Sequence, residues 1–225
     1  MGSMVSFPRV GGGTAQGYLA EAKSAGAPAV VVIQEWWGIQ GQIKGTCDRL
    51  AAEGFTAIAP DLYGGKVVPY HDPTAAQAAM SALDFKAATD QAVRGAVQYL
   101  KGRGAKKVGL TGFCMGGAVT VIGAAHIPEL DAAVCFYGIP PESVAAPKDI
   151  RVPFQGHFAD QDDWCTPAVV NEFEKKLVAA GKKYEIHRYP GHHAFMNSDR
   201  KEVYDDASAK VAWNRMVKFF RQHLA

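Results

Sequence analysis

Short runs of Val, Ile and Phe alternate along the chain with longer segments in which apolar residues recur every three or four positions. The short runs are typical of strands buried on both faces, and the longer segments are typical of amphipathic helices. Strands are predicted at residues 29–34, 56–60, 107–110, 132–137, 152–156 and 184–189. Helices are predicted at residues 40–52, 73–100 with a break, 115–125, 167–180 and 202–223. This alternation predicts an α/β fold, with a mainly parallel sheet flanked by helices on both faces.

The composition fits one globular domain, since 48% of the 225 residues are hydrophobic and 20% are charged. We expect a single domain over residues 1–225, of which residues 1–4 are partly derived from cloning. The net charge of +2 is spread along the chain without a dense basic run, which argues against a nucleic-acid partner. No apolar run approaches the roughly 20 residues that cross a bilayer, and no secretory leader is evident, so we expect a cytoplasmic protein.

The four cysteines lie far apart in the sequence and form no CxxC pair. They are Cys47, Cys114, Cys135 and Cys165. This spacing predicts free thiols and argues against a disulfide framework.

One cysteine stands in the glycine-rich stretch "LTGFCMGG", where Gly112 and Gly116 flank Cys114 between a predicted strand and a predicted helix. This is the pattern of a nucleophile elbow, in which larger residues at the glycine positions would collide with nearby backbone. The start of the helix favours a thiolate, because the helix dipole is positive there. An isolated cysteine is more often a buried structural residue, but this setting favours a nucleophile.

Acidic and histidine residues follow two later strands, in "ADQDDW" and "YPGHHAF". In a parallel sheet the carboxyl ends of strands share one edge, so these groups can converge on Cys114. The order nucleophile, acid, histidine is that of α/β-hydrolases. Asp160, Asp162 and Asp163 could instead only cap the next helix. A calcium loop would need a glycine and a distal glutamate, and a zinc site would need a different histidine spacing, so no metal is expected.

A glutamate, Glu35, stands in "QEWWG" directly after the most apolar strand. We expect it to be partly buried, which would raise the pKa of its carboxyl group. The loop at this place in an α/β-hydrolase supplies one oxyanion-hole N–H, and the residue after the nucleophile supplies the other. These positions are Trp36 and Met115. Alternatively, Trp36 and Trp37 are only core residues and Glu35 is exposed.

The motifs "QEWWG", "APDLYGG", "GFCMGG", "ADQDDW" and "YPGHHAF", in this order, resemble those of the dienelactone hydrolase (carboxymethylenebutenolidase) family, which has the α/β-hydrolase fold. The resemblance covers nearly the whole chain. It implies that Cys114 is the nucleophile, that Asp162 is the acid with Asp160 as the alternative, and that His193 is the base. It also implies that Glu35 interacts with the resting thiol.

The implied reaction is hydrolysis of an enol-lactone to a dicarboxylate such as maleylacetate, in the degradation of aromatic compounds. No cofactor is needed. The expected partner is a small-molecule lactone or ester, and the expected assembly is a monomer or weak homodimer. The expected substrate-binding residues are Trp37, Tyr137, Phe195 and Asn197.

The chain departs from well-known members in the residues that grip the substrate carboxylate. Asn197 stands where those members have an arginine, with Arg200 nearby, so a hydrolase of other small esters is the main alternative. A dinucleotide-binding protein would need G-x-G-x-x-G, which the chain lacks at the elbow. A redox or amidotransferase-like cysteine elbow would typically read C-H-G, whereas Cys114 is followed by Met115.

Overall fold

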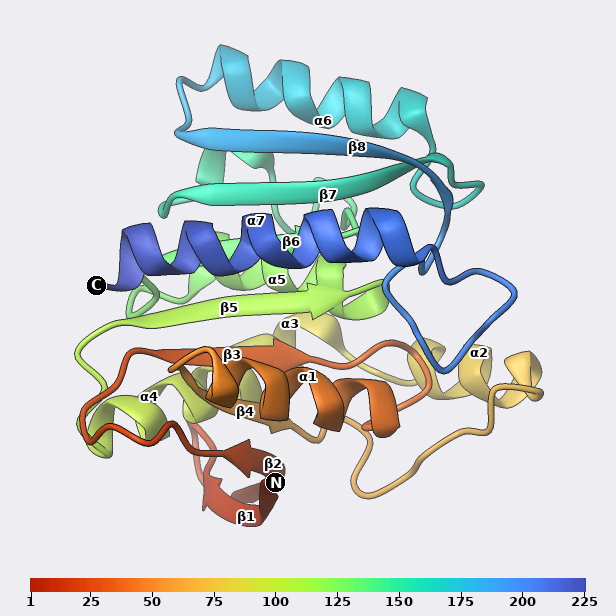
Figure 1. The fold of residues 1–225 in the computed structure, drawn as a ribbon. Helices are drawn as coiled ribbons and strands as arrows, with labels where there is room; N and C mark the ends of the chain where they lie inside the picture. Colours follow the sequence, from red (N-terminus) through yellow and green to blue (C-terminus); the bar gives the residue numbers. More distant parts are fainter.

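One eight-stranded sheet runs through the protein, in a computed structural model that describes all 225 residues (Figure 1). Its order is β1-β2-β4-β3-β5-β6-β7-β8. The strands are β1 (Ser3–Pro8), β2 (Thr14–Ala20), β3 (Ala29–Ile33), β4 (Thr56–Pro60), β5 (Val108–Phe113), β6 (Ala132–Phe136), β7 (Phe154–Gln161) and β8 (Tyr184–His192). The pairs β1–β2 and β2–β4 are antiparallel, and every other pair is parallel.

Helices cover both faces of this sheet, as the sequence pattern predicts. The helices are α1 (Gly41–Ala52), α2 (Pro73–Ser81), α3 (Phe85–Ala88), a π-helical turn (Thr89–Val93), α4 (Arg94–Gly102), α5 (Met115–His126), a 3₁₀ turn (Pro147–Asp149), α6 (Pro167–Ala179) and α7 (Asp206–Leu224). Helices α1 and α7 lie in front of the sheet in Figure 1 and share one buried apolar cluster with Val30 and Val32 of β3. The neighbouring side chains, Val31 and Ile33, point to the other face, where α4 packs.

The structure differs from the predicted elements mainly at the N-terminus, where the hairpin of β1 and β2 was not predicted. Its strands contain no long apolar run, and they join through Gly11–Gly13, all at positive φ. The predicted break in the helix over 73–100 is confirmed, because α2 ends at Ser81 and α3 begins at Phe85. The last helix begins later than predicted because Asp205 caps it, accepting a hydrogen bond from Ser208 N at 2.9 Å.

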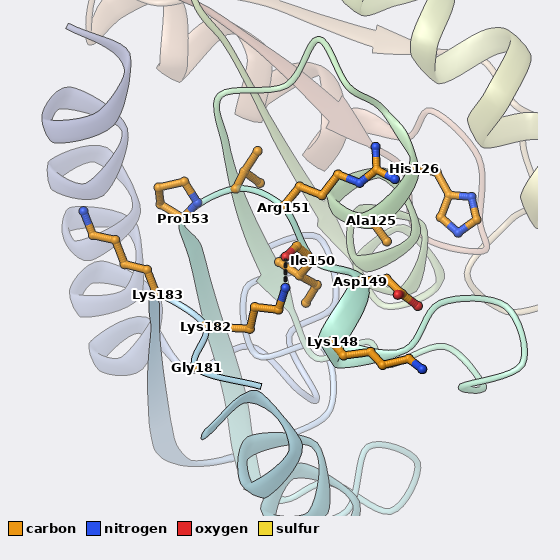
Figure 2. A pocket seen from close by; sticks show the side chains of 11 residues that line it. Ala125, His126, Lys148, Asp149, Ile150, Arg151, Pro153, Gly181, Lys182 and Lys183 are labelled. Carbon is orange, nitrogen blue, oxygen red and sulfur yellow. Dashed lines mark hydrogen bonds between the residues drawn. The ribbon is translucent and has the colours of Figure 1, made fainter. Parts of the chain in front are cut away.

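The two edges of the parallel strands differ in what surrounds them. The connections that follow the carboxyl ends of β3, β5, β7 and β8 carry the predicted catalytic residues. At the amino ends of β7 and β8, the turn before each strand borders an open hollow of about 810 Å³ (Figure 2). No helix is both long and apolar enough to cross a membrane.

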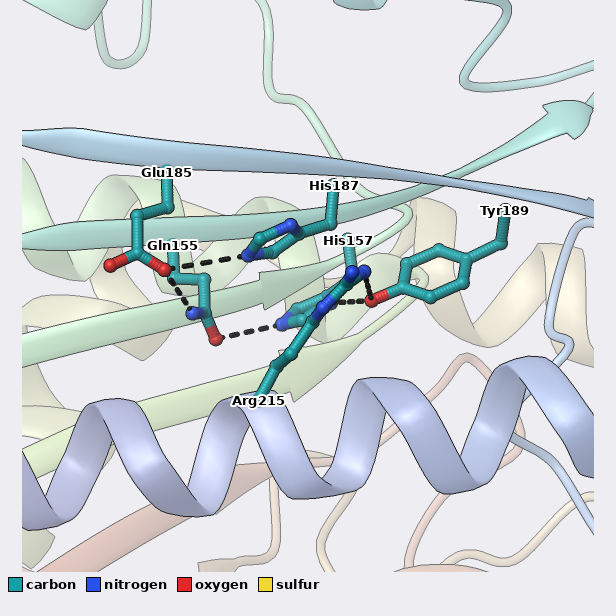
Figure 3. A network of polar contacts seen from close by, with 6 residues as sticks. All are labelled: Gln155, His157, Glu185, His187, Tyr189 and Arg215. Atoms are coloured by element: carbon teal, nitrogen blue, oxygen red, sulfur yellow. Dashed lines mark hydrogen bonds and ion pairs between the residues drawn. The ribbon is translucent and has the colours of Figure 1, made fainter.

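A buried polar network lies between α7 and strands β7 and β8 (Figure 3). His157 is fully buried and its Nε2 lies 2.8 Å from Gln155 Oε1, while its Nδ1 lies 2.7 Å from the Tyr189 hydroxyl. Because an amide oxygen only accepts, Nε2 carries the proton and Nδ1 accepts from Tyr189. Arg215 Nη1 in turn donates to the Tyr189 oxygen at 3.1 Å. The neutral histidine is therefore held in one tautomer.

Burial lowers the pKa of His157 well below its usual range, and the nearby His187 and Arg215 act in the same direction. The unfolded chain takes up a proton on this residue near pH 6.5, whereas the folded chain does not. Folding stability is therefore lost as the pH falls below about 6.5, by up to about 1.4 kcal/mol per pH unit. In His157→Phe this part of the pH dependence should disappear. Urea denaturation at pH 7, 6 and 5 measures the free energy of unfolding of both proteins. An equal change of this free energy with pH in the two proteins would contradict a neutral His157.

Candidate active site

The parallel direction of the strands gathers the predicted catalytic residues at one edge of the sheet. Glu35 follows β3, Cys114 follows β5, Asp162 follows β7 and His193 follows β8. These positions are separated by up to 158 residues of sequence, and only the topology brings them together.

Cys114 occupies a strained turn between β5 and α5, with φ 57° and ψ −119°. Residues other than glycine rarely adopt this conformation, which costs on the order of 1–3 kcal/mol. The backbone is so close here that a Cβ at Gly112 would lie 2.2 Å from the carbonyl oxygen of Gly116. A Cβ at Gly116 would lie 2.5 Å from the carbonyl oxygen of Ile33. The predicted steric need for both glycines is confirmed.

Asp162 and His193 form a close pair beside this turn. Asp162 Oδ2 lies 2.7 Å from His193 Nδ1. The other carboxylate oxygen, Oδ1, accepts hydrogen bonds from the backbone N–H groups of Trp164 and Cys165, both at 2.8 Å. Asp160 is exposed and makes no such bond, so of the two predicted alternatives only Asp162 contacts His193.

The charges of this pair support each other. Burial would raise the pKa of Asp162, but hydrogen bonds from His193 and two backbone amides lower it overall. Burial would lower the pKa of His193, but Asp162 and the nearby Cys114 thiol outweigh that effect and raise the pKa to about 10. His193 Nε2 is buried and has no hydrogen-bond partner, so it remains free to act on the thiol or on a substrate atom.

Glu35 is almost completely buried at the end of β3. Its carboxylate accepts hydrogen bonds from Asn197 Nδ2 at 2.7 Å and from the Tyr137 hydroxyl at 3.3 Å. Burial raises the pKa of Glu35, although these two donors act against it. The predicted burial and the predicted direction of the pKa are both confirmed. No hydrogen bond joins Glu35 to Cys114.

The two N–H groups predicted for an oxyanion hole are available. The backbone N–H of Trp36 donates no hydrogen bond within the protein. Met115 is the first residue of α5, so its N–H is one of the helix-terminal groups that lack an intrahelical acceptor.

A cavity of about 290 Å³ opens onto Cys114 and His193. Its lining residues come from several strand ends and from α2: Glu35, Trp36, Trp37, Gln77, Met80, Cys114, Asp163, Trp164, His193, Ala194 and Arg200. Arg200 is the only cationic side chain among Lys and Arg that lines it, and its guanidinium lies 5.6 Å from the Trp37 ring centre. Trp164 stands at the entrance, 47% exposed and edge-on to His193.

Of the four residues predicted to bind substrate, only Trp37 lines this cavity. Tyr137 is buried behind His193, with the two ring centres 5.0 Å apart, and Phe195 packs behind Tyr137. Asn197 is buried against Glu35. These three side chains therefore support the residues that face the cavity.

Several wall residues were not predicted from the sequence, among them Gln77 and Met80. These two residues belong to α2, which follows the long connection after β4 and lies beside the loop that follows β8 (Figure 1). The length of that connection was the only signal, since long connections often form binding loops.

Comparisons with known proteins agree with this geometry. The model of the Dienelactone hydrolase family matches residues 15–224. The chain is 38% identical to "Protein usf" of Aquifex pyrophilus and 37% identical to the "Putative carboxymethylenebutenolidase" of Aquifex aeolicus, in both cases over 100% of each chain. It superposes on the crystal structure of a "putative dienelactone hydrolase" from Klebsiella pneumoniae with a TM-score of 0.86 at 31% identity, over 99% of each chain.

Replacing Asp162 by Asn should lower the pKa of His193. The wild-type pKa of about 10 depends on the Asp162 carboxylate, so its loss should lower the value by about 1 to 3 pH units. NMR titration of the His193 ring nitrogens measures this change. Asp160→Asn is the matched control and should leave the titration unchanged, whereas an effect of equal size in both variants would contradict the pairing.

Proposed function

The chain belongs to the dienelactone hydrolase family, and on this basis we propose that it opens small enol-lactones by cysteine-dependent hydrolysis. Its membership makes it an ester-hydrolysing enzyme of the α/β-hydrolase fold. The observation that carries the finer proposal is the placement of His193. Its Nδ1 is held by buried Asp162 at 2.7 Å, and its unpartnered Nε2 lies near the Cys114 thiol.

In the first step, Glu35 takes the thiol proton, His193 stays protonated, and the Cys114 sulfur attacks the lactone carbonyl carbon. A C–S bond forms, the carbonyl oxygen becomes negative, and the free N–H groups of Trp36 and Met115 stabilise it. One such donor is typically worth about 10² to 10³ in kcat. The ring C–O bond then breaks, and the leaving enolate remains attached to the acyl chain of the thioester.

The second step, hydrolysis of the thioester, depends on the loss of negative charge at the Cys114 sulfur. A thiolate next to His193 raises the pKa of the imidazole, and formation of the thioester removes that contribution. The imidazole can then give up its proton to the enolate and act as a base for water. Water attacks the thioester and gives a proton to His193, the C–S bond breaks, and the acid product leaves as the thiolate reforms. Glu35 then returns its proton to the Cys114 sulfur.

Glu35 supports this cycle from below the nucleophile. Because its pKa is raised by burial, it can exchange a proton more easily than an exposed carboxylate. We assign to it the task of accepting the thiol proton when substrate reaches Cys114. Asn197 and Tyr137 hold the carboxylate ready for this role with neutral donors.

The cavity restricts the substrate to a small molecule. A volume of about 290 Å³ is at the low end for ligand sites, and tryptophan rings form much of its wall. We propose that Arg200 binds a substrate carboxylate, since it is the cation that faces the cavity. The alternative is a hydrolase of simple short-chain esters, which is favoured by the pairing of Arg200 with Glu202 at 2.8 Å.

Cys114→Ala and His193→Ala should each lower kcat/KM for p-nitrophenyl acetate by at least about a thousandfold, because each removes a member of one chemical unit. Steady-state rates and circular dichroism on the purified variants test this outcome. Cys47→Ala, at a buried thiol in α1, is the control and should keep the wild-type rate. Full activity in Cys114→Ala would refute the mechanism.

The substitution Arg200→Gln tests whether the substrate is a lactone that carries a carboxylate or a simple ester. It should raise KM for cis- and trans-dienelactone about tenfold, through loss of a charge-assisted hydrogen bond, and leave p-nitrophenyl acetate hydrolysis unchanged. Lys201 is an exposed neighbour of Arg200, so Lys201→Gln is the matched control and should leave KM unchanged. Unchanged KM for the lactones, with better turnover of simple esters by wild type, would favour the alternative.

A further inference from the structure

An open hollow lies far from Cys114, at the amino ends of β7 and β8 (Figure 2). Its volume of about 810 Å³ is bounded by the end of α5, the 3₁₀ turn and the turn before β8. The strand β7 runs from this hollow to Asp162 over eight residues, a span of about 25 Å. The hollow is therefore separate from the catalytic cavity.

The side chain of Lys182 in this hollow has an unusual environment. It is partly buried, and its ammonium donates one hydrogen bond to the Ile150 carbonyl oxygen at 2.7 Å. No carboxylate forms an ion pair with it. Such a partner is present for five of the other six partly buried lysines and arginines: Arg94, Lys101, Lys176, Arg188 and Arg200. The sixth, Lys107, donates to the backbone oxygens of His223 and Ala225. The Lys182 ammonium therefore has two free N–H groups and an unpaired charge that are available to a ligand.

Other cations border the same hollow. Lys148 and Arg151 are exposed on its wall and form no ion pair, while Asp149 is the only carboxylate there and also forms none. Figure 2 shows Lys182 lying across to Ile150, with Lys148, Asp149 and Arg151 on one side and Lys183 extending away from them. Three unpaired cations thus face one acidic group.

We propose that this hollow binds a small multivalent anion of the phosphate type, with Lys182 as its anchor. The excess of positive charge favours an anion, and the two free N–H bonds of Lys182 favour a ligand with several acceptor oxygens. The partly buried position of Lys182 favours a small molecule, because a long polyanion gains most of its affinity from exposed charges. This site is independent of the hydrolytic mechanism proposed above.

Isothermal titration calorimetry with inorganic phosphate and with pyrophosphate at low ionic strength tests the proposal. Lys182→Met should weaken pyrophosphate binding by about tenfold or more, since it removes charge-assisted hydrogen bonds. Asp149→Asn should have the opposite effect and tighten binding, because it removes a like charge from the site. Hydrolysis of p-nitrophenyl acetate at the wild-type rate in both variants shows that they are folded.

Lys218→Met, at an exposed lysine on α7 without an ion pair, is the matched control and should bind pyrophosphate as the wild type does. An equal loss in Lys218→Met would show diffuse attraction to charge and overturn the proposal. Wild-type affinity in Lys182→Met, or heparin binding without pyrophosphate binding, would overturn it as well.

Discussion

The close approach of three backbone segments around Cys114 is the constraint on which the site depends. Strand β5, helix α5 and the end of β3 lie so near one another that only glycine fits at Gly112 and Gly116. This packing holds Cys114 at φ 57°, a strained conformation that persists only because the surrounding structure fixes it. The same geometry places the cysteine beside the N–H of Met115 and next to the turn that begins at Glu35. The nucleophile and its predicted oxyanion donors are thus parts of one rigid unit.

Two carboxylates near this unit, Asp162 and Glu35, have different electrostatic environments. Asp162 accepts several hydrogen bonds, which keep it ionised and hold a proton on His193. Glu35 is more deeply buried and its hydrogen bonds come from neutral donors, so burial outweighs them and its pKa is raised. One carboxylate is therefore suited to stabilising an imidazolium and the other to exchanging a proton. Two acids of similar intrinsic strength acquire different chemical uses through their different burial and hydrogen bonds.

The parallel sheet also divides the molecule into two chemically different edges. Its carboxyl edge carries an enclosed, aromatic cavity, whereas its amino edge carries an open hollow with unpaired cations. Both sites involve β7 and β8, whose opposite ends lead to Asp162 and His193 on one side and to the turn at Lys182 on the other. The long strands keep these sites apart, so charge at one edge has little direct effect on the chemistry at the other.

Much of the fold and the turn around Cys114 could be predicted from the sequence, because both depend on local patterns of residues. Apolar runs mark the central strands, and the spacing of Gly112, Cys114 and Gly116 marks the elbow. The choice between Asp160 and Asp162 depended on where β7 ends: Asp160 still lies in the strand and faces solvent, while Asp162 lies in the turn that reaches His193. The part of the cavity wall that α2 supplies was inaccessible to sequence reasoning, because α2 comes to the cavity only through the long connection after β4. The sequence by itself determined the elements and the kinds of reactive group, since these follow from neighbouring residues. The tertiary structure alone decided which groups meet and which face the substrate, because these depend on contacts between distant segments.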